Sequence, residues 1–317
     1  MTDLQMLNLR VHRLEWAARD VLELELRAPD GADLPAYEPG AHIDIQLPNG
    51  LSRSYSLKGD PALRDRYVVG VGLDARSRGG SSYIHGSLRI GQEIPVRAPL
   101  NHFPLAEAPK TVLIAGGIGV TPMTCMAREL ARRGVDFEFH YAVREKARAA
   151  FLDELSGYCP GLALHTDDIA GGPLDLAPIV AGQPEGTHFY CCGPAPMMAA
   201  FEAITESLPA ETIHVEYFSP KPVETGGADA GFTVVLQKTG KTVEVAADET
   251  ILDAVKRVGI VPDTSCEDGI CGTCETRILE GVADHRDSVL TKKEQEAGKT
   301  MMICVSRCKG DRLVLDL

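Results

Sequence analysis

The 317-residue sequence contains no apolar run of the roughly 20 residues that a membrane-spanning helix needs. Positive charge is also scarce, because 45 Asp and Glu against 32 Lys and Arg give a net charge of −13. Nucleic-acid binding requires a basic surface, so this charge argues against a nucleic-acid partner. Residues 1–6 show neither the basic nor the apolar segment of a secretory signal. We therefore expect a cytoplasmic protein with no membrane or nucleic-acid partner.

The composition is that of a soluble globular protein, with 44% hydrophobic and 24% charged residues. The length allows two or three domains with ordinary cores. The nine cysteines are odd in number and follow no secretory signal, which fits a reducing compartment better than a disulfide framework.

Four of the cysteines have the spacing C-x4-C-x2-C followed by a distant fourth. This spacing is typical of the ligands of a plant-type 2Fe–2S cluster. Gly269 and Gly272 lie between the first three cysteines, and they allow the loop to turn tightly because glycine tolerates positive φ. The sequence therefore predicts a cluster held by Cys266, Cys271, Cys274 and Cys304. Such a cluster moves single electrons, so the rest of the chain must supply or receive them.

Other interpretations of these cysteines are a zinc site and a disulfide framework. Zinc sites with four cysteines usually show two paired C-x2-4-C knuckles, whereas here three clustered cysteines precede one remote partner. Cys308 is the rival for the fourth position. We favour Cys304, because it lies in the apolar, strand-like run 301–305, whereas Cys308 leads into the charged stretch 309–312.

The pattern of apolar and turn-forming residues changes along the chain and indicates three regions. Up to about residue 103, short runs of alternating apolar residues between turn signals predict a small antiparallel β-barrel. From Lys110, strands alternate with glycine turns and helices, as in a doubly wound parallel sheet. Residues 220–231 are typical of an exposed linker. Beyond them, the runs 232–236 and 241–245 flank Thr239-Gly240 and predict a hairpin, and residues 250–258 predict an amphipathic helix.

A glycine turn follows the buried-strand run 111–115 and precedes a stretch, to Arg133, that can form a helix. Glycines at this place let backbone amides and the helix dipole face a pyrophosphate. The spacing differs from G-x-G-x-x-G, so a tight turn without a ligand is the alternative. The turn comprises Gly116, Gly117, Ile118, Gly119, Val120, Thr121 and Pro122.

A second motif of this kind follows the predicted strand 187–191, where Cys192, Gly193 and Pro194 lead into a predicted helix over 195–207. A small thiol there would lie beside whatever the first turn binds. The alternative for Cys192 is a small buried side chain, which is a common place for free cysteine.

The predicted barrel carries two segments suited to an anion and a flat ring. The run Arg53-Ser54-Tyr55-Ser56 offers a guanidinium, an aromatic ring and hydroxyls; on a strand, Arg53 and Tyr55 share one face and the two serines the other. The segment 76–81 offers a second anion cradle through Arg76, Ser77, Arg78, Gly79, Gly80 and Ser81. The alternative is two basic loops on an acidic protein.

Together these motifs resemble the phthalate dioxygenase reductase family, the single-chain reductases of Rieske oxygenases within the ferredoxin–NADP reductase superfamily. The resemblance covers essentially the whole chain and implies three domains. They are a β-barrel that binds FMN (1–104), an α/β domain with a doubly wound parallel sheet that binds NAD (105–224), and an α+β plant-type ferredoxin of the β-grasp kind (225–317).

The resemblance also implies roles for single residues. Arg53 would bind FMN phosphate or its ribityl chain, with Ser54 beside it, and Arg78, Gly79, Gly80 and Ser81 would form the FMN phosphate loop. Tyr55 would pack on the flavin ring and Phe218 would cover its other face, with a place in the core as the alternative. Ser56 would bond near flavin N5 and Cys192 would approach nicotinamide C4. Gly116, Gly117, Ile118, Thr121, Gly193 and Pro194 would contact the cofactors.

The resemblance implies that electrons pass from NADH to FMN, then to the 2Fe–2S cluster, and finally to the Rieske centre of an aromatic-ring dioxygenase or O-demethylase. We expect a monomer that uses NADH, although Arg144, Lys146 and Arg148 could serve the 2′-phosphate of NADPH; Asp167 and Asp168 could oppose it. The alternatives are a reductase that serves a non-Rieske acceptor, and a redox-sensing or electron-carrying module.

Overall fold

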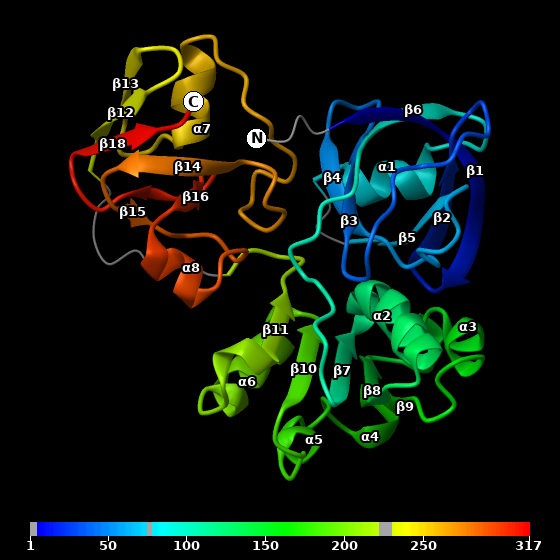
Figure 1. Ribbon diagram of the computed structural model, residues 1–317. Coiled ribbons are helices and arrows are strands. Elements are labelled where there is room, and N and C mark those ends of the chain that lie inside the picture. Colours follow the sequence, from blue (N-terminus) through cyan, green and yellow to red (C-terminus); the bar gives the residue numbers. More distant parts are fainter. Residues whose placement is uncertain (1–4, 75–77, 222–229) are drawn as a thin grey trace. The chain divides into compact units, whose positions relative to one another are not determined.

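The computed structural model describes residues 5–74, 78–221 and 230–317, and Figure 1 shows its two compact units. Unit 1 comprises residues 1–218 and unit 2 residues 219–317, and each is described by itself. Most of the predicted linker (222–229), and Arg76 and Ser77 of the predicted anion cradle, lie outside the described residues.

The N-terminal part of unit 1 is an antiparallel barrel of six strands, drawn in blue and cyan in Figure 1. The strands are β1 (Met6–Ala18), β2 (Val21–Arg27), β3 (His42–Gln46), β4 (Ser52–Ser56), β5 (Tyr67–Gly72) and β6 (Glu93–Arg97). Their order is β4-β3-β6-β1-β2-β5, and a bridge between Leu57 and Val69 joins the two edges. A short helix, α1 (Gly80–Gly86), follows β5. Closing the sheet in this way removes its unpaired edges.

The C-terminal part of unit 1 is a parallel sheet of five strands. They are β7 (Lys110–Gly116), β8 (Asp136–Val143), β9 (Ala163–Thr166), β10 (Thr187–Cys192) and β11 (Ile213–Glu216), in the order β11-β10-β7-β8-β9. The helices are α2 (Val120–Arg133), α3 (Leu152–Ser156), α4 (Asp167–Ala170), α5 (Ala177–Val180) and α6 (Ala195–Thr205), with short 3-10 turns at Gly117–Gly119, Lys146–Arg148 and Ala210–Thr212. The chain reverses its direction of winding between β7 and β10, where ligands bind in sheets of this type.

The barrel and the parallel sheet contact each other closely within unit 1. At Gly70 of β5, an added Cβ would lie 2.6 Å from Thr121 Cγ2 at the start of α2. Nearby, the buried Lys58 ammonium donates to Glu23 of the barrel (2.5 Å) and to Glu154 of α3 (2.7 Å). A cation with two carboxylate partners satisfies the charge that burial would otherwise leave unpaired. These contacts fix the end of β4 relative to the carboxyl ends of the parallel strands.

Unit 2 contains a mixed sheet in the order β13-β12-β18-β14-β16. Its strands are β12 (Phe232–Leu236), β13 (Lys241–Val245), β14 (Glu275–Glu280), β16 (Thr300–Met302) and β18 (Arg312–Leu315), with a small separate pair, β15 (Ala283–Asp284) and β17 (Arg307–Cys308). The helices are α7 (Ile251–Arg257) and α8 (Lys292–Ala297). The predicted hairpin is present, and Thr250 caps α7 by accepting from the Asp253 amide.

One predicted element differs from the structure. The apolar run 301–305 was expected to be a strand, but β16 ends at Met302 and a turn follows. Val305 and Ser306 both donate their amides to the Met302 carbonyl. Cys304 therefore lies in a tight turn and not in a strand. The turn directs its side chain into the protein interior, where it is buried. In the part of the chain that the structure describes, no helix has both the length and the apolar character needed to cross a membrane.

Candidate functional site

The glycine turn after β7 lies at the carboxyl edge of the parallel sheet. It forms a 3-10 turn at Gly117–Gly119 that leads directly into α2, so the helix N-terminus faces the sheet edge. Gly119 approaches the next strand so closely that an added Cβ would lie 2.1 Å from the Cys192 carbonyl oxygen. Glycine is needed there because any side chain would collide with the backbone.

The second predicted turn, Cys192-Gly193-Pro194, adjoins the first. β10 pairs with β7 in register, with Cys192 opposite Ala115, and the chain then enters α6. An added Cβ at Gly116 would lie 2.6 Å from Pro194 Cδ. The structure therefore brings together the two glycine-containing turns that the sequence places 76 residues apart, counted from Gly116 to Cys192 (192 − 116).

Three polar side chains meet where the barrel contacts this edge. Cys192 pairs with Glu216 across β10 and β11, and Ser56 Oγ, at the end of β4, donates to Glu216 Oε2 at 3.2 Å. Burial raises the pKa of Glu216 to about 8, against the lowering effect of the Ser56 hydrogen bond. Burial, and next the Glu216 charge, raise the pKa of the Cys192 thiol well above its usual range. Near neutral pH both groups therefore hold protons.

On the barrel side, Arg53 lies against the first turn of α1. An added Cβ at Gly80 would meet Arg53 Cγ at 2.8 Å and Nε at 2.9 Å, so the Arg53 side chain lies directly against the start of the helix. Arg53 Nη1 donates to the Ser52 carbonyl. Tyr55, half-buried, packs against the barrel core. Ser54, on the opposite face of β4, donates to Asp44.

The residues around Gly80 form a compact loop. Gly79 has φ 105°, which favours glycine, and its carbonyl accepts from Asn49 Nδ2 at 3.1 Å. Ser81 Oγ accepts from the Asp74 amide. The structure thus places Arg53 next to the 78–81 segment, which the sequence separates from it by more than twenty residues. A guanidinium beside glycine amides and a hydroxyl fits the phosphate of a flavin mononucleotide.

Phe218 follows Glu216 and Tyr217 at the end of unit 1. Its ring is half-buried and packs against the core cluster beneath the parallel sheet. Thr121, almost completely buried, donates its hydroxyl to the Ile118 carbonyl within the glycine turn. Thr121 thus stabilises the turn and also contacts the barrel through Gly70.

In unit 2, the four predicted cysteines are buried and lie in two pairs. Cys274 and Cys304 have sulfurs 3.2 Å apart, and Cys266 is hydrogen-bonded to Cys271. The neighbouring Cys274 thiol, and next burial, raise the pKa of Cys304, whereas a hydrogen bond from the Gly269 backbone opposes this rise. Cys308, by contrast, is half-exposed on β17 and accepts from the Gly310 amide.

Two cysteine pairs suit a two-iron cluster better than a single ion. A mononuclear zinc site needs four ligands around one point, whereas a 2Fe–2S cluster takes two sulfurs at each iron. All four thiols are buried, so a centre that they bind would be shielded from solvent.

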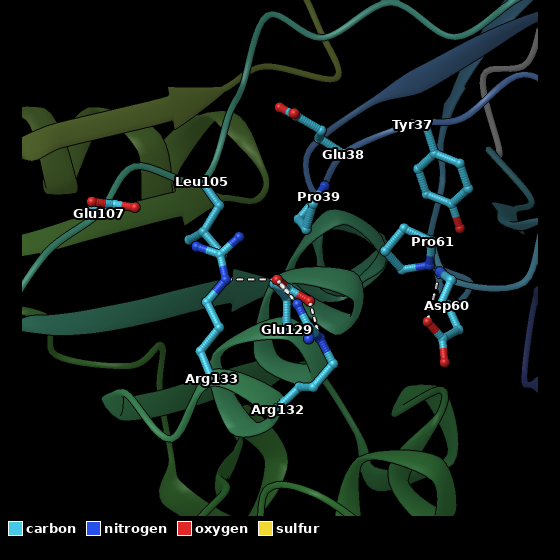
Figure 2. A pocket seen from close by; sticks show the side chains of 11 residues that line it. Tyr37, Glu38, Pro39, Asp60, Pro61, Leu105, Glu107, Glu129, Arg132 and Arg133 are labelled. Carbon is cyan, nitrogen blue, oxygen red and sulfur yellow. Dashed lines mark hydrogen bonds and ion pairs between the residues drawn. The ribbon is translucent and has the colours of Figure 1, made fainter.

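A cavity of about 580 Å³ lies elsewhere in unit 1 (Figure 2). Arg132 and Arg133, the last residues of α2, line it, and both donate to Glu129. These hydrogen bonds hold the pKa of Glu129 near 2. The cavity is therefore at the end of α2 opposite the glycine turn, and none of the predicted site residues lines it.

Glu216 is the site residue that the sequence reasoning missed. A carboxylate at the end of a short apolar strand, 24 residues after Cys192 (216 − 192), carries no motif of its own. The available signal was topological, since β11 ends at the same sheet edge as β10.

Comparison with known proteins agrees with this architecture. Residues 234–309 match the family model of the 2Fe-2S iron-sulfur cluster binding domain. The chain is 49% identical to phenoxybenzoate dioxygenase subunit beta of Ectopseudomonas oleovorans, over 98% of this chain and 97% of that protein. Among solved structures, phthalate dioxygenase reductase matches with a TM-score of 0.72 and 37% identity, over 98% of both chains. An intact type IV self-sufficient cytochrome P450 monooxygenase matches with a TM-score of 0.91 and 43% identity, over 98% of this chain and 41% of that one.

The barrel, the parallel sheet and the iron–sulfur domain define an electron-transfer oxidoreductase that combines a flavin, a nicotinamide nucleotide and a 2Fe–2S cluster. The chain belongs to the phthalate dioxygenase reductase family. The predicted family, fold class and enzyme class are therefore confirmed.

Proposed function

We propose that this chain is the NADH-dependent reductase component of a Rieske-type aromatic oxygenase, a dioxygenase or an O-demethylase. When bound, FMN accepts hydride from NADH and the 2Fe–2S cluster carries the electrons singly to the Rieske centre of the oxygenase. The observation that carries the proposal is the Ser56–Glu216 hydrogen bond beside Cys192, because it joins the barrel strand that carries the flavin motif to the sheet edge that carries the nicotinamide motif.

Within this proposal the chain divides at the predicted boundaries, into residues 1–104, 105–224 and 225–317. Arg53 and the segment 78–81 hold the FMN phosphate and ribityl chain, with Ser54 bracing β4 through Asp44. Tyr55 and Phe218 pack on the two faces of the flavin ring. The Phe218 side chain moves away from that face when the nicotinamide ring binds there.

Ser56, Cys192 and Glu216 serve the reacting ends of the two cofactors. The protonated Glu216 holds a proton one hydrogen bond from Ser56 Oγ, the group assigned to flavin N5. Cys192, uncharged and buried, presents an apolar surface to nicotinamide C4. Backbone amides of Gly116, Gly117 and Ile118, with Thr121, Gly193 and Pro194 around them, receive the pyrophosphate at the N-terminus of α2.

Cys266, Cys271, Cys274 and Cys304 are the cluster ligands in this proposal. Burial of all four and their arrangement in two pairs support the assignment, and the half-exposed position of Cys308 supports Cys304 as the fourth ligand. The nine free cysteines also support a reducing, cytoplasmic location, and we propose that the protein acts there as a monomer.

The test is electron delivery by the purified holoprotein. Flavin released by heat should be FMN by chromatography, and anaerobic NADH should bleach both the flavin and the cluster absorption. A purified Rieske oxygenase should then be reduced at a rate that depends on its concentration. A yellow-brown protein that NADH does not bleach would instead be an electron carrier or a sensor, and the reductase assignment would be wrong.

A second acceptor is supported by one specific comparison. The self-sufficient P450 monooxygenase contains a region 43% identical to this chain, so a haem protein is an alternative recipient of the electrons. Comparing the reduction rates of a Rieske oxygenase and of a bacterial P450, under the same conditions, distinguishes the two functions.

A further inference from the structure

The turn between β1 and β2 of the barrel forms hydrogen bonds and ion pairs with the loop that follows β8. Arg19 donates its amide to the Ala147 carbonyl at 2.8 Å, and its Nη1 lies 2.8 Å from Glu145 Oε1. Arg148 Nη1 lies 2.7 Å from Asp20 Oδ2, and Arg148 Nε lies 3.0 Å from the same Glu145 oxygen. Two arginines and two carboxylates therefore alternate in one network, in which Arg148 has a carboxylate on each side.

Asp20 is held rigidly in this network by its backbone. It has φ 63°, one of the few left-handed conformations among non-glycine residues here, and its carbonyl accepts from the Leu73 amide at 2.7 Å. Aspartate and asparagine tolerate this conformation better than most side chains. The tight turn thus sets the direction in which the Asp20 side chain leaves the backbone toward Arg148.

The loop after β8 lies at the place where we expect the adenosine end of a dinucleotide to bind. Under the proposed function, the pyrophosphate lies at the glycine turn after β7, and the nicotinamide end extends toward β10 and β11, where Cys192 and Glu216 lie. The adenosine end must extend the opposite way, across the carboxyl end of β8, which is the neighbour of β7 on the other side. The 3-10 turn Lys146–Arg148 follows that strand end.

NADPH differs from NADH by a 2′-phosphate on the adenosine ribose, and its recognition needs free cations. The loop carries Arg144, Lys146 and Arg148. Within residues 5–74, 78–221 and 230–317, the side chains of Arg144 and Lys146 form no ion pair, whereas Arg148 is paired with both Asp20 and Glu145. The Asp168 amide donates to the Arg144 carbonyl, so a further carboxylate residue adjoins the loop.

We propose that Asp20, a barrel residue, is a positioning residue for nucleotide choice. It holds Arg148 in an ion pair and adds a negative charge beside the ribose, so that Arg148 is not available to a 2′-phosphate and the local field opposes one. The inference rests on the proposed nicotinamide site and adds to it a determinant from the other domain. Preference for NADH then depends on the contact between barrel and loop, and not on the loop residues alone.

The test compares two inert nucleotide fragments by calorimetric titration of the oxidised holoprotein. One is 5′-AMP, and the other is adenosine 2′,5′-bisphosphate, which carries the extra phosphate. In Asp20→Asn, the affinity for the bisphosphate should rise about fivefold to tenfold, while that for 5′-AMP should change less than about twofold. Asparagine keeps the shape and suits φ 63°, so only the charge is removed.

Two further variants make the result specific. Adding Arg148→Gln to Asp20→Asn should return the ratio of the two affinities to the wild-type value, because the arginine that has lost one of its two carboxylate partners is then absent. Asp33→Asn removes an equal charge from an exposed barrel loop and should leave the ratio unchanged. If Asp20→Asn fails to fold, Asp20→Gly, which also accepts positive φ, should show the same rise.

The possible results distinguish the role of Asp20 from the existence of the nicotinamide site. An unchanged ratio in Asp20→Asn or Asp20→Gly, with normal 5′-AMP binding, would overturn the role of Asp20 and leave the nicotinamide site intact. A ratio that rises in Asp20→Asn and stays raised when Arg148→Gln is added would also overturn it. Arg148 would then not be the group that binds the extra phosphate. Failure of wild-type protein to bind either fragment would overturn the nicotinamide site and this inference together.

Discussion

Ser56 Oγ lies 3.2 Å from Glu216 Oε2, although 160 residues separate the two in the chain. The serine ends a barrel strand and the glutamate ends the last strand of the parallel sheet. Their hydrogen bond therefore reports directly on how the barrel and the sheet are joined, and it places a protonated carboxyl group at the centre of the proposed site.

The first prediction concerns the pH dependence of stability. Burial raises the pKa of Glu216 from its ordinary value of 4.5 to about 8. Between these values the unfolded chain has lost this proton while the folded protein keeps it, so this group's contribution to stability is present below pH 4.5 and is lost as pH rises toward 8. Glu216→Gln cannot lose this proton. Its Tm should therefore improve relative to wild type from pH 5 to pH 8, measured by thermal unfolding.

The exposed Glu185 offers a matched control, since Glu185→Gln makes the same substitution at the surface. Its Tm should follow the wild-type curve in parallel across this range. Parallel curves for Glu216→Gln as well would show that Glu216 is already ionised near neutral pH.

The second prediction concerns Ser56. Removing its hydroxyl in Ser56→Ala takes away the hydrogen bond to Glu216 and the polar group assigned to a place near flavin N5. Flavin reduction by NADH in stopped-flow experiments should slow by roughly 10²-fold, as for loss of one positioned donor. Ser156→Ala, at an exposed hydroxyl on α3, should reduce at the wild-type rate. A wild-type rate in Ser56→Ala would remove the residue from the reacting site.

The third prediction separates the flavin from the cluster. Cys271→Ser should lower NADH-dependent reduction of cytochrome c by more than about 100-fold, because a missing thiolate prevents cluster assembly. Reduction of ferricyanide should continue, since the flavin can supply this acceptor directly. Equal loss of both activities would contradict that division of labour.

The fourth prediction distinguishes Cys304 from Cys308. Cys304 is buried 3.2 Å from Cys274, whereas Cys308 is half-exposed on β17. Cys304→Ser should therefore lose the visible absorption and the reduced-state EPR signal of the cluster, and Cys308→Ser should keep both. The reverse pattern would assign the fourth ligand to Cys308.

The fifth prediction tests the close approach at the glycine turn. In Gly119→Ala, the new methyl group would lie 2.1 Å from the Cys192 carbonyl oxygen, and a backbone atom cannot move aside cheaply. We expect a loss of about 2 kcal/mol, or roughly 4–8 °C in the Tm of this unit. Gly161→Ala, where nothing lies within 4 Å, should unfold at the wild-type temperature. A wild-type Tm in Gly119→Ala would show that the two turns separate easily.

Features that depend on residues close together in the sequence could be predicted well. The cysteine spacing indicated a two-iron cluster, because three of the predicted ligands lie in one loop whose geometry is local. Alternating apolar residues likewise predicted strands such as β2 and β5. The run 301–305 misled, because apolar content cannot distinguish a strand from a buried turn; β16 ends at Met302 so that Cys304 can face Cys274.

The amino-acid sequence is enough to assign the family, the order of the three folds and the types of group available for an anion, a nucleotide and a cluster. Which of these groups meet depends on how the chain packs. The packing places Glu216 beside Ser56 and Cys192, and it sets Asp20 of the barrel against Arg148 of the sheet. The reason is physical: a motif depends on neighbours along the chain, whereas pKa shifts and ion pairs depend on neighbours in space, which the packing of barrel on sheet creates.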